Sequence, residues 1–221
     1  MNRKKKILNK LLKRDKRAKI KKNGGAKSKY ISKSHQNKLA KSTPQAVIDY
    51  WFSDKVKASW FSKTTELDDE IRTKYEFLLE SALKGYIDNW QETAQGSLAL
   101  AIIFDQLPRK MFRDKSRSYQ TENNAVNVVK YAIQQGYLAE LTSEQQPFII
   151  IPLMHSENLE NQNLSIELFK QYKLTQHLVL AEKNQKIIQS YGRFPHRNHI
   201  LDRSSTVKEQ IYLKSEQTFK D

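Results

Sequence analysis

The sequence contains no cysteine, which excludes disulfide bonds and any metal or iron–sulfur site built on thiolates. It also leaves no thiol nucleophile for catalysis. No stretch approaches the roughly 20 apolar residues that a membrane-spanning helix needs, and the basic N-terminus is not followed by the apolar segment of a signal peptide. The chain is therefore expected to be cytoplasmic.

Glycine is scarce, with 6 in 221 residues, and the glycine-rich functional motifs are absent. There is no Walker A loop, no Rossmann fingerprint and no G-x-S-x-G elbow. The usual nucleotide-binding and serine-hydrolase templates therefore do not apply, and no cofactor is expected.

Positive charge is concentrated at one end of the chain. Residues 1–42 contain 17 Lys and Arg and a single acid, Asp15, whereas the other 179 residues contain 22 basic and 23 acidic residues. We therefore divide the chain into a basic arm, residues 1–42, and a helical domain, residues 43–221. The arm has too little apolar sequence to offset the entropy of ordering, so it is predicted to be largely disordered when free, with some helix.

A segment with a formal charge of +16 would bind polyanions by releasing their counterions. RNA, including ribosomal RNA, is favoured over specific DNA sites because the arm has no base-reading motif. An anionic membrane is the alternative, since Ile7, Leu8, Leu11 and Leu12 form an apolar stripe on a basic helix. The stripe is short and lacks the Trp and Phe that anchor such helices in a membrane, which favours RNA over the membrane. A solvated tail without a dedicated partner is the third possibility.

Helix start and stop signals organise the rest of the chain. Thr43 followed by Pro44 is a strong helix start, because Thr caps helices and Pro suits their first position. Gly85 and Gly136 each end a pattern of helical periodicity. Thr206 and Glu209 form a capping-box pattern that opens a last helix.

Two apolar runs are ambiguous between helix and strand. Leu98–Phe104 contains Ala and Leu, which favour helix. Phe148–Leu153 is the most strand-like stretch, but no partner strand of similar quality occurs, so it is interpreted as buried helix or extended core. The sequence thus predicts an all-α fold, an array of about seven or eight helices in antiparallel pairs without a sheet.

Four segments hold more polar and aromatic side chains than plain packing requires. Their predicted ligand-binding residues are Asp105, Gln106, Arg109, Arg113, Arg193, Arg197, Asn198 and Arg203. The candidate catalytic residues are His155, Glu157 and His196, and the candidate pocket aromatics are Trp60, Phe61 and Phe194.

If the arginines converge, their planar guanidiniums would bind an anionic small molecule or a peptide terminus. His155 and His196 would then serve as acid or base, since histidine titrates near neutral pH, and Glu157 would orient a histidine or take a proton. The structural alternative is that carboxylates of the fold pair with these arginines and hold loops in place without chemistry. In that case the domain is a helical interaction scaffold that the arm brings to RNA or ribosomes.

A metal site is a further possibility for His155, Glu157 and His196, whose side chains suit zinc. However, His-x-Glu on a helix points the two side chains apart. The simpler interpretation is that Ser156 caps the following helix and Glu157 lies at its positive end. No metal is expected, and the sequence does not indicate an oligomeric state.

Three long motifs carry a family resemblance: DQLPRKMFR, PLMHSE and GRFPHRNHILDRSST. With their order and spacing, residues 44–214 resemble the uncharacterised, mainly bacterial family called domain of unknown function 924. The resemblance implies an all-helical fold of paired helices, similar to tetratricopeptide arrays, and implies no activity. Tyr191, Asp202 and Glu122 depart from the family pattern, which has Phe, Gly and Asp there. In the arm, MNRKKKI and KSKYISKS resemble a second family, domain of unknown function 2986.

Overall fold

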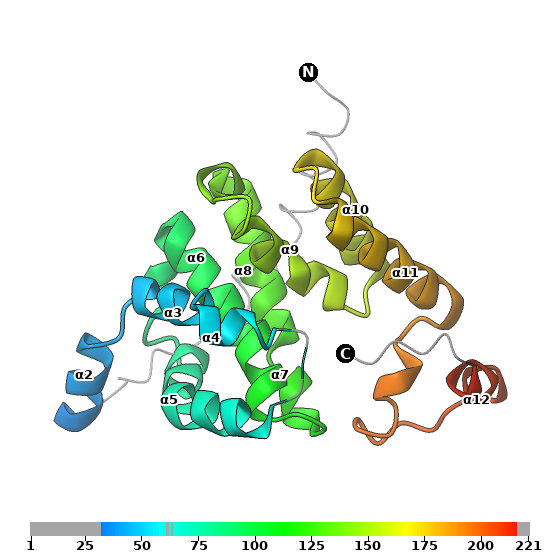
Figure 1. Ribbon diagram of the computed structural model, residues 1–221, viewed down its shortest axis with the longest axis horizontal. Coiled ribbons are helices and arrows are strands. Elements are labelled where there is room, and N and C mark those ends of the chain that lie inside the picture. The colour runs from blue at the N-terminus through cyan, green and yellow to red at the C-terminus, as the bar shows by residue number, and fades with distance from the viewer. Residues whose placement is uncertain (1–31, 61, 63, 216–221) are drawn as a thin grey trace, which may run out of the picture. The chain divides into compact units, whose positions relative to one another are not determined.

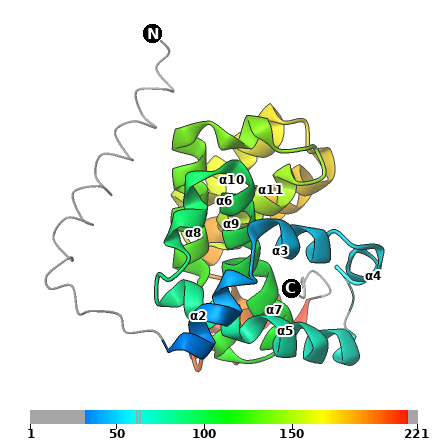
Figure 2. The same cartoon turned by 90° about the vertical axis from the view of Figure 1, so that its left-hand side faces the viewer.

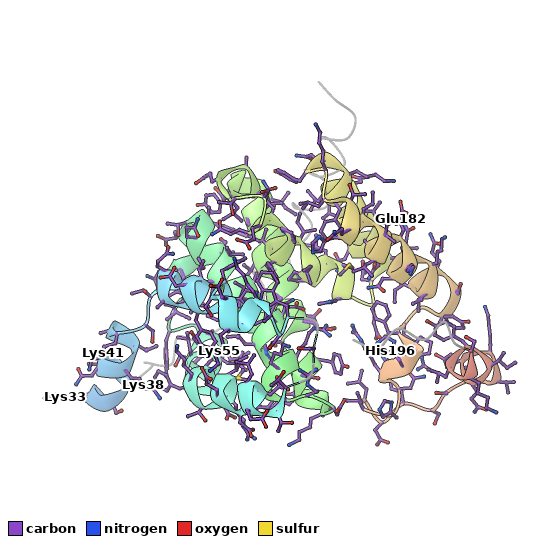
Figure 3. All side chains as sticks on the ribbon, in the orientation of Figure 1. Lys33, Lys38, Lys41, Lys55, Glu182 and His196 are labelled. Carbon is purple, nitrogen blue, oxygen red and sulfur yellow. The ribbon has the colours of Figure 1, made fainter. Side chains whose placement is uncertain are left out.

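A computed structural model of the chain describes residues 32–60, 62 and 64–215. The chain divides into two compact units, residues 1–41 and 42–221. In the first unit, Lys33–Ala40 form helix α2, and the exposed side chains of Lys33, Lys38 and Lys41 project around it (Figure 3). The prediction of disorder concerned the whole arm, residues 1–42, of which residues 1–31 lie outside the described residues.

The described residues of the second unit contain helices joined by turns and no strand, which confirms the all-α class. Short helices such as α4 and α7 raise the number of helices above the seven or eight expected, and the tetratricopeptide-like pairing stays a prediction. No helix in the described residues is long and apolar enough to cross a membrane. The α-helices are α3 (Pro44–Trp51), α4 (Asp54–Lys57), α5 (Thr65–Leu83), α6 (Ala94–Ala101), α7 (Leu107–Met111), α8 (Glu122–Gln135), α9 (Gln146–His155), α10 (Leu159–Gln171), α11 (Thr175–Tyr191) and α12 (Val207–Lys214).

Three of the predicted helix boundaries, at Thr43, Gly136 and Thr206, are confirmed. The side-chain oxygen of Thr43 accepts a hydrogen bond from the amide of Ala46 at 3.1 Å, and α3 begins at Pro44. Gly136 follows α8 with φ +79°, a left-handed conformation that glycine adopts without steric cost. Thr206 and Glu209 form both bonds of the capping box that opens α12.

Helix α9 lies at the centre of the second unit and contacts α6, α8, α10 and α11. Figures 1 and 2 show α10 and α11 side by side next to α9, with α5 and α7 together on the other side. Every residue of α9 from Pro147 to Met154 is buried. The run that resembled a strand is therefore a helix that is apolar on all faces because it is covered on all faces.

Helix α6 continues into α7 through a wider π-helical turn, Ile102–Gln106. The amide of Leu107 bonds the carbonyl of Ile102, five residues back. Pro108 has no N–H to offer the carbonyl of Phe104, and the Thr121 hydroxyl donates to that carbonyl instead, at 2.6 Å. One turn with an extra residue thus places Asp105 toward the centre of the domain.

Gly96 in α6 is required by a close approach of backbone. A Cβ atom at this position would lie 1.8 Å from the carbonyl oxygen of Trp90 and 2.7 Å from its carbonyl carbon. We expect Gly96→Ala to lower the free energy of unfolding by about 3 kcal/mol or more, because the backbone around Trp90 must move. Urea denaturation measures this effect.

Gly192→Ala is the matched control. Gly192 has φ +70°, but no atom beyond the glycine and its two chain neighbours lies within 4 Å of the position that a Cβ would occupy, so its replacement meets only backbone strain of about 1–2 kcal/mol. Equal losses for the two variants would contradict the steric explanation.

Candidate functional site

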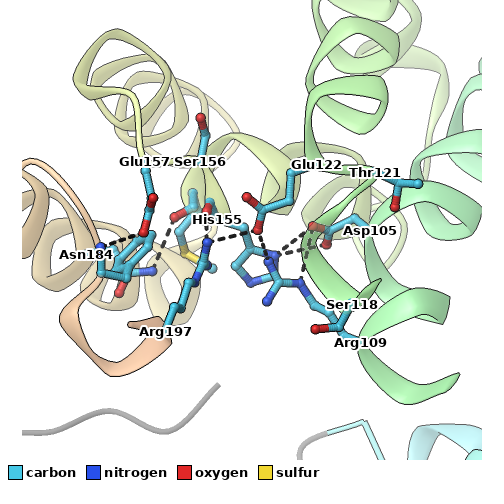
Figure 4. Close-up of polar contacts among 12 residues, drawn as sticks. Asp105, Arg109, Ser118, Thr121, Glu122, His155, Ser156, Glu157, Asn184 and Arg197 are labelled. Atoms are coloured by element: carbon cyan, nitrogen blue, oxygen red, sulfur yellow. Dashed lines mark hydrogen bonds and ion pairs between the residues drawn. The ribbon is translucent and has the colours of Figure 1, made fainter. Parts of the chain in front are cut away.

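Five charged or titratable side chains from five elements meet near the end of α9 (Figure 4). They come from the wide turn, from α7, from the first residue of α8, from the last residue of α9 and from the short 3-10 turn Pro195–Arg197. We call this group the His155 cluster. Its members are Asp105, Arg109, Glu122, His155 and Arg197.

Asp105 holds His155 through a single ring nitrogen. Nδ1 of His155 lies 3.0 Å from each carboxylate oxygen of Asp105, which is only 1% exposed. Gln106 Nε2 and Arg109 Nε also donate to this carboxylate, at 2.5 and 3.4 Å. Burial acts to raise the pKa of Asp105, but the charges of His155 and Arg109 and these hydrogen bonds prevail and hold it at about 2. Asp105 is therefore an ionised acceptor at neutral pH.

Glu122 links the two arginines of the cluster. Its Oε1 accepts from Arg109 Nη2 at 2.6 Å and from Arg197 Nη1 at 2.9 Å. Burial raises the pKa of Glu122, and this effect outweighs the lowering by the guanidiniums of Arg197 and Arg109. The side chain remains 18% exposed, so the group is at the edge of the cluster and not in its interior.

Arg197 anchors the segment after α11 to the rest of the domain. Its side chain is 1% exposed, and its Nη2 donates to the backbone carbonyl of His155 at 3.1 Å. The guanidinium carbon lies 4.7 Å from the ring centroid of Tyr119 and 4.3 Å from that of Phe194. Arg197 thus combines an ion pair, a hydrogen bond to the last residue of α9 and two aromatic contacts.

The backbone after α9 is fixed by polar side chains of α10. Gln162 Nε2 donates to the carbonyls of Met154 and Ser156, both at 2.7 Å. Asn158 caps α10 by accepting from the amide of Asn161, so the expectation that Ser156 would cap this helix was wrong. Ser156 instead accepts a hydrogen bond from the side chain of Asn161.

Glu157 belongs to a second group of contacts. Both of its oxygens accept from the guanidinium of Arg203, at 2.6 and 2.9 Å, and Oε1 also accepts from the amide of Phe194 at 2.8 Å. Arg203 Nε donates to Asn198 Oδ1 at 3.1 Å. Although burial acts to raise it, the pKa of Glu157 is lowered by these hydrogen bonds and by the charge of Arg203. Glu157 therefore holds the loop after α11 to the end of α9.

The two remaining predicted arginines lie in other ion pairs. Arg193 donates to both oxygens of Glu209 in α12, at 2.7 and 2.9 Å. A surface depression of about 400 Å³ is lined by this pair, by Ser190 and Tyr191 of α11, and by Thr206 and Lys208. Arg113 donates to both oxygens of Asp68 in α5, at 2.7 and 3.1 Å. The depression thus lies beside Arg193 and is not lined by His155.

The other candidates have separate surroundings. The ring of His196 lies 5.5 Å from that of Phe194. Trp60 packs on Phe148 at 4.5 Å and donates from its indole nitrogen to the Trp51 carbonyl, and Phe61 lies outside the described residues. Within those residues no group of three His, Asp or Glu side chains has an arrangement suited to a metal ion.

The three motifs noted in the sequence thus converge, since Asp105, His155 and Arg197 each come from a different one. Residues 47–217 match the family described as bacterial protein of unknown function (DUF924). The chain belongs to the DUF924 family. Residues 1–43 match a second family, protein of unknown function DUF2986. Both resemblances seen in the sequence are therefore confirmed.

One solved structure is similar to this DUF924 protein. It is a protein of unknown function, ATU0120 from Agrobacterium tumefaciens, with 30% sequence identity and a TM-score of 0.71. The match covers 77% of this chain and 96% of the other. No curated protein sequence matches the chain.

In this DUF924 chain, all five arginines singled out from the sequence donate to carboxylates. Sequence reasoning missed three of those carboxylates, Asp68, Glu122 and Glu209. Glu209 was visible only as half of a capping box. Glu122 was visible only as a departure from the family pattern at the start of a helix, where an acidic residue is ordinary.

Proposed function

We propose that the helical domain is an acid–base enzyme in which His155 accepts a proton from the substrate. The observation that carries the proposal is the contact of Nδ1 with both oxygens of a buried, ionised Asp105. An ionised carboxylate only accepts hydrogen bonds, so neutral His155 must carry its proton on Nδ1. The lone pair of Nε2 is then available as a base, and Asp105 is the positioning residue.

The surroundings of His155 support this role. Its side chain is 15% exposed, and within the described residues no hydrogen bond reaches Nε2. The wide turn that places Asp105 is the kind of helical irregularity that often occurs at functional sites. The guanidiniums of the five predicted arginines already contact carboxylates of the fold. The proposal therefore rests on proton transfer by His155, and recognition of an anionic small molecule or peptide by these arginines stays a prediction.

The test is hydrolysis of p-nitrophenyl acetate, a small ester; water is the second reactant, and a basic imidazole takes the proton from the water molecule that attacks the ester. We expect His155→Gln to lower the rate at least about 100-fold, the usual contribution of a general base. His199→Gln is the control, since His199 is exposed and lies near the cluster in sequence. Equal rates for the wild type and His155→Gln would contradict the proposal.

A second function concerns the arm, for which we propose RNA binding. Its support is the concentration of charge, +16 in residues 1–42 against −1 in the remainder. The described part of the arm presents exposed lysines on α2 (Figure 3). In this alternative the domain is a scaffold of paired helices, its arginines are structural, and removal of the arm is the direct test.

A further inference from the structure

We propose that Glu122 is a second catalytic residue, a proton donor that works with His155 on the same substrate. This inference rests on the proposed acid–base function. In the sequence, Glu122 stands out only as a departure from the family pattern. Its candidacy comes from geometry, because the two oxygens of its carboxyl group differ in their contacts.

Within the described part of the chain, the hydrogen bonds to Glu122 end on one of its two oxygens. The hydrogen bonds from Arg109 and Arg197 both end on Oε1. Among the described residues no donor reaches Oε2, and the side chain keeps 18% exposure. A carboxyl group can therefore carry a proton on Oε2 while Oε1 keeps both guanidinium bonds, because a neutral carboxylic acid still has an accepting carbonyl oxygen.

The two buried members of the His155 cluster hold two of its three partly exposed members. Asp105 and Arg197 are each 1% exposed, and they fix His155 and Glu122 respectively. The same cluster thus presents Nε2 of His155, without a proton, and Oε2 of Glu122. The cluster, built from five elements, thus leaves Nε2 of His155 and Oε2 of Glu122 without a hydrogen bond among the described residues, an arrangement that suits proton transfer.

The charges around Glu122 set its protonation. The positive charges of Arg197 and Arg109 favour the ionised form of Glu122, and the negative charge of Asp105 favours its neutral form. A protonated His155 also favours the ionised form of Glu122. Burial is the largest influence and raises the pKa of Glu122. Glu157 is the contrasting case, since the pKa of that carboxyl is lowered by its bonds to Arg203 and to the amide of Phe194.

In the proposed reaction, a bond from hydrogen to one substrate atom breaks as Nε2 of His155 takes that proton. The O–H bond of Glu122 breaks as its proton passes to a second substrate atom. His155 has then gained one proton and Glu122 has lost one. Both return to their starting states when His155 releases its proton to water and Glu122 takes one up from water. The substrate class is a molecule that loses a proton at one atom and gains one at another.

The test uses the full chain and needs no substrate. Carbon-13 NMR of labelled glutamate side chains follows each carboxyl through its titration, with Glu122→Gln and Glu157→Gln to assign the two signals. We expect Glu122 to titrate above the usual value of 4.5 and Glu157 below it. A water-soluble carbodiimide, which attacks protonated and reachable carboxyls, should modify Glu122 faster than Glu157 near pH 6, because a larger fraction of the carboxyl with the raised pKa is protonated there.

Glu157 is a close control, since its side chain is 24% exposed against 18% for Glu122 and also contacts arginine. A midpoint for Glu122 at or below that of Glu157, or carbodiimide modification no faster than at Glu157, overturns the proposal. Nitrogen-15 shifts of His155 separate the two ideas. If these shifts show that neutral His155 carries its proton on Nε2 and not on Nδ1, the proposed function of His155 is wrong. The carbon-13 signal of Glu122 tests the present proposal independently of that result.

Discussion

Replacing Arg197 with alanine should lower the free energy of unfolding by about 3–5 kcal/mol, the usual cost of breaking a buried ion pair by removing one partner. Arg197 is 1% exposed and its partner Glu122 is 18% exposed. The variant also loses the hydrogen bond to the carbonyl of His155 and the contacts with the rings of Tyr119 and Phe194. Urea denaturation, followed by circular dichroism, measures the loss.

Arg72→Ala is the matched control, because Arg72 makes an ion pair with Glu76 on the exposed face of α5. Its loss should cost about 0.5 kcal/mol or less. The double variant of Arg197→Ala with Glu122→Gln should cost less than the sum of the two single variants, since both single variants disturb the same contact between Arg197 and Glu122. If Arg197→Ala costs no more than Arg72→Ala, Arg197 does not anchor the C-terminal segment.

Removing residues 1–42 should lower the affinity for single-stranded RNA by about 10³-fold or more at low salt. The remaining residues have a formal charge of −1, so little electrostatic attraction is left. For the whole chain, about six to ten phosphate contacts would make affinity fall by roughly 10³–10⁵ between about 50 and 200 mM salt. Fluorescence anisotropy of a labelled RNA over a salt series measures both effects.

A full-length variant with the arm cations Lys4, Lys5, Lys6, Lys21 and Lys22 replaced by glutamine is the control for chain length. This variant should weaken RNA binding at every salt concentration and reduce the slope of log affinity against log salt concentration. RNA binding that survives deletion of the arm would place the nucleic-acid site in the helical domain. Binding to anionic vesicles but not RNA would favour the membrane alternative.

Local signals explain why much of the fold could be predicted. The caps at Thr43, Gly136 and Thr206 depend on nearby backbone groups, so sequence alone identifies them. Phe148–Leu153 could not be assigned, because its branched side chains suit a strand and only the four helices packed around α9 decide for helix. The wide turn before Pro108 was missed; the carbonyl of Phe104 in this turn accepts from the hydroxyl of Thr121, 17 residues along the chain, and helical periodicity does not indicate such a contact.

The candidate site was predictable in its motifs but not in its pairings. Asp105, His155 and Arg197 were each singled out, and the structure brings them together. Arg109 and Arg113 come from one motif, yet Arg113 turns to Asp68 on another helix. Which arginine meets which carboxylate depends on helix positions to within a few ångströms, and periodicity does not contain that information. Glu122 was missed for the same reason.

The wide turn between α6 and α7 also makes the site sensitive to chain length. Successive residues of an α-helix are rotated by about 100°. With one residue fewer in Ile102–Gln106, α6 would continue into α7 as a regular α-helix. Arg109 would then be rotated about the helix axis by about 100° and would point away from Glu122, while α6 kept its buried face. The number of residues in this turn therefore positions the site as much as the side chains do. Deleting one residue there would move Asp105 and Arg109 away from their partners at the same time, which no single substitution would do.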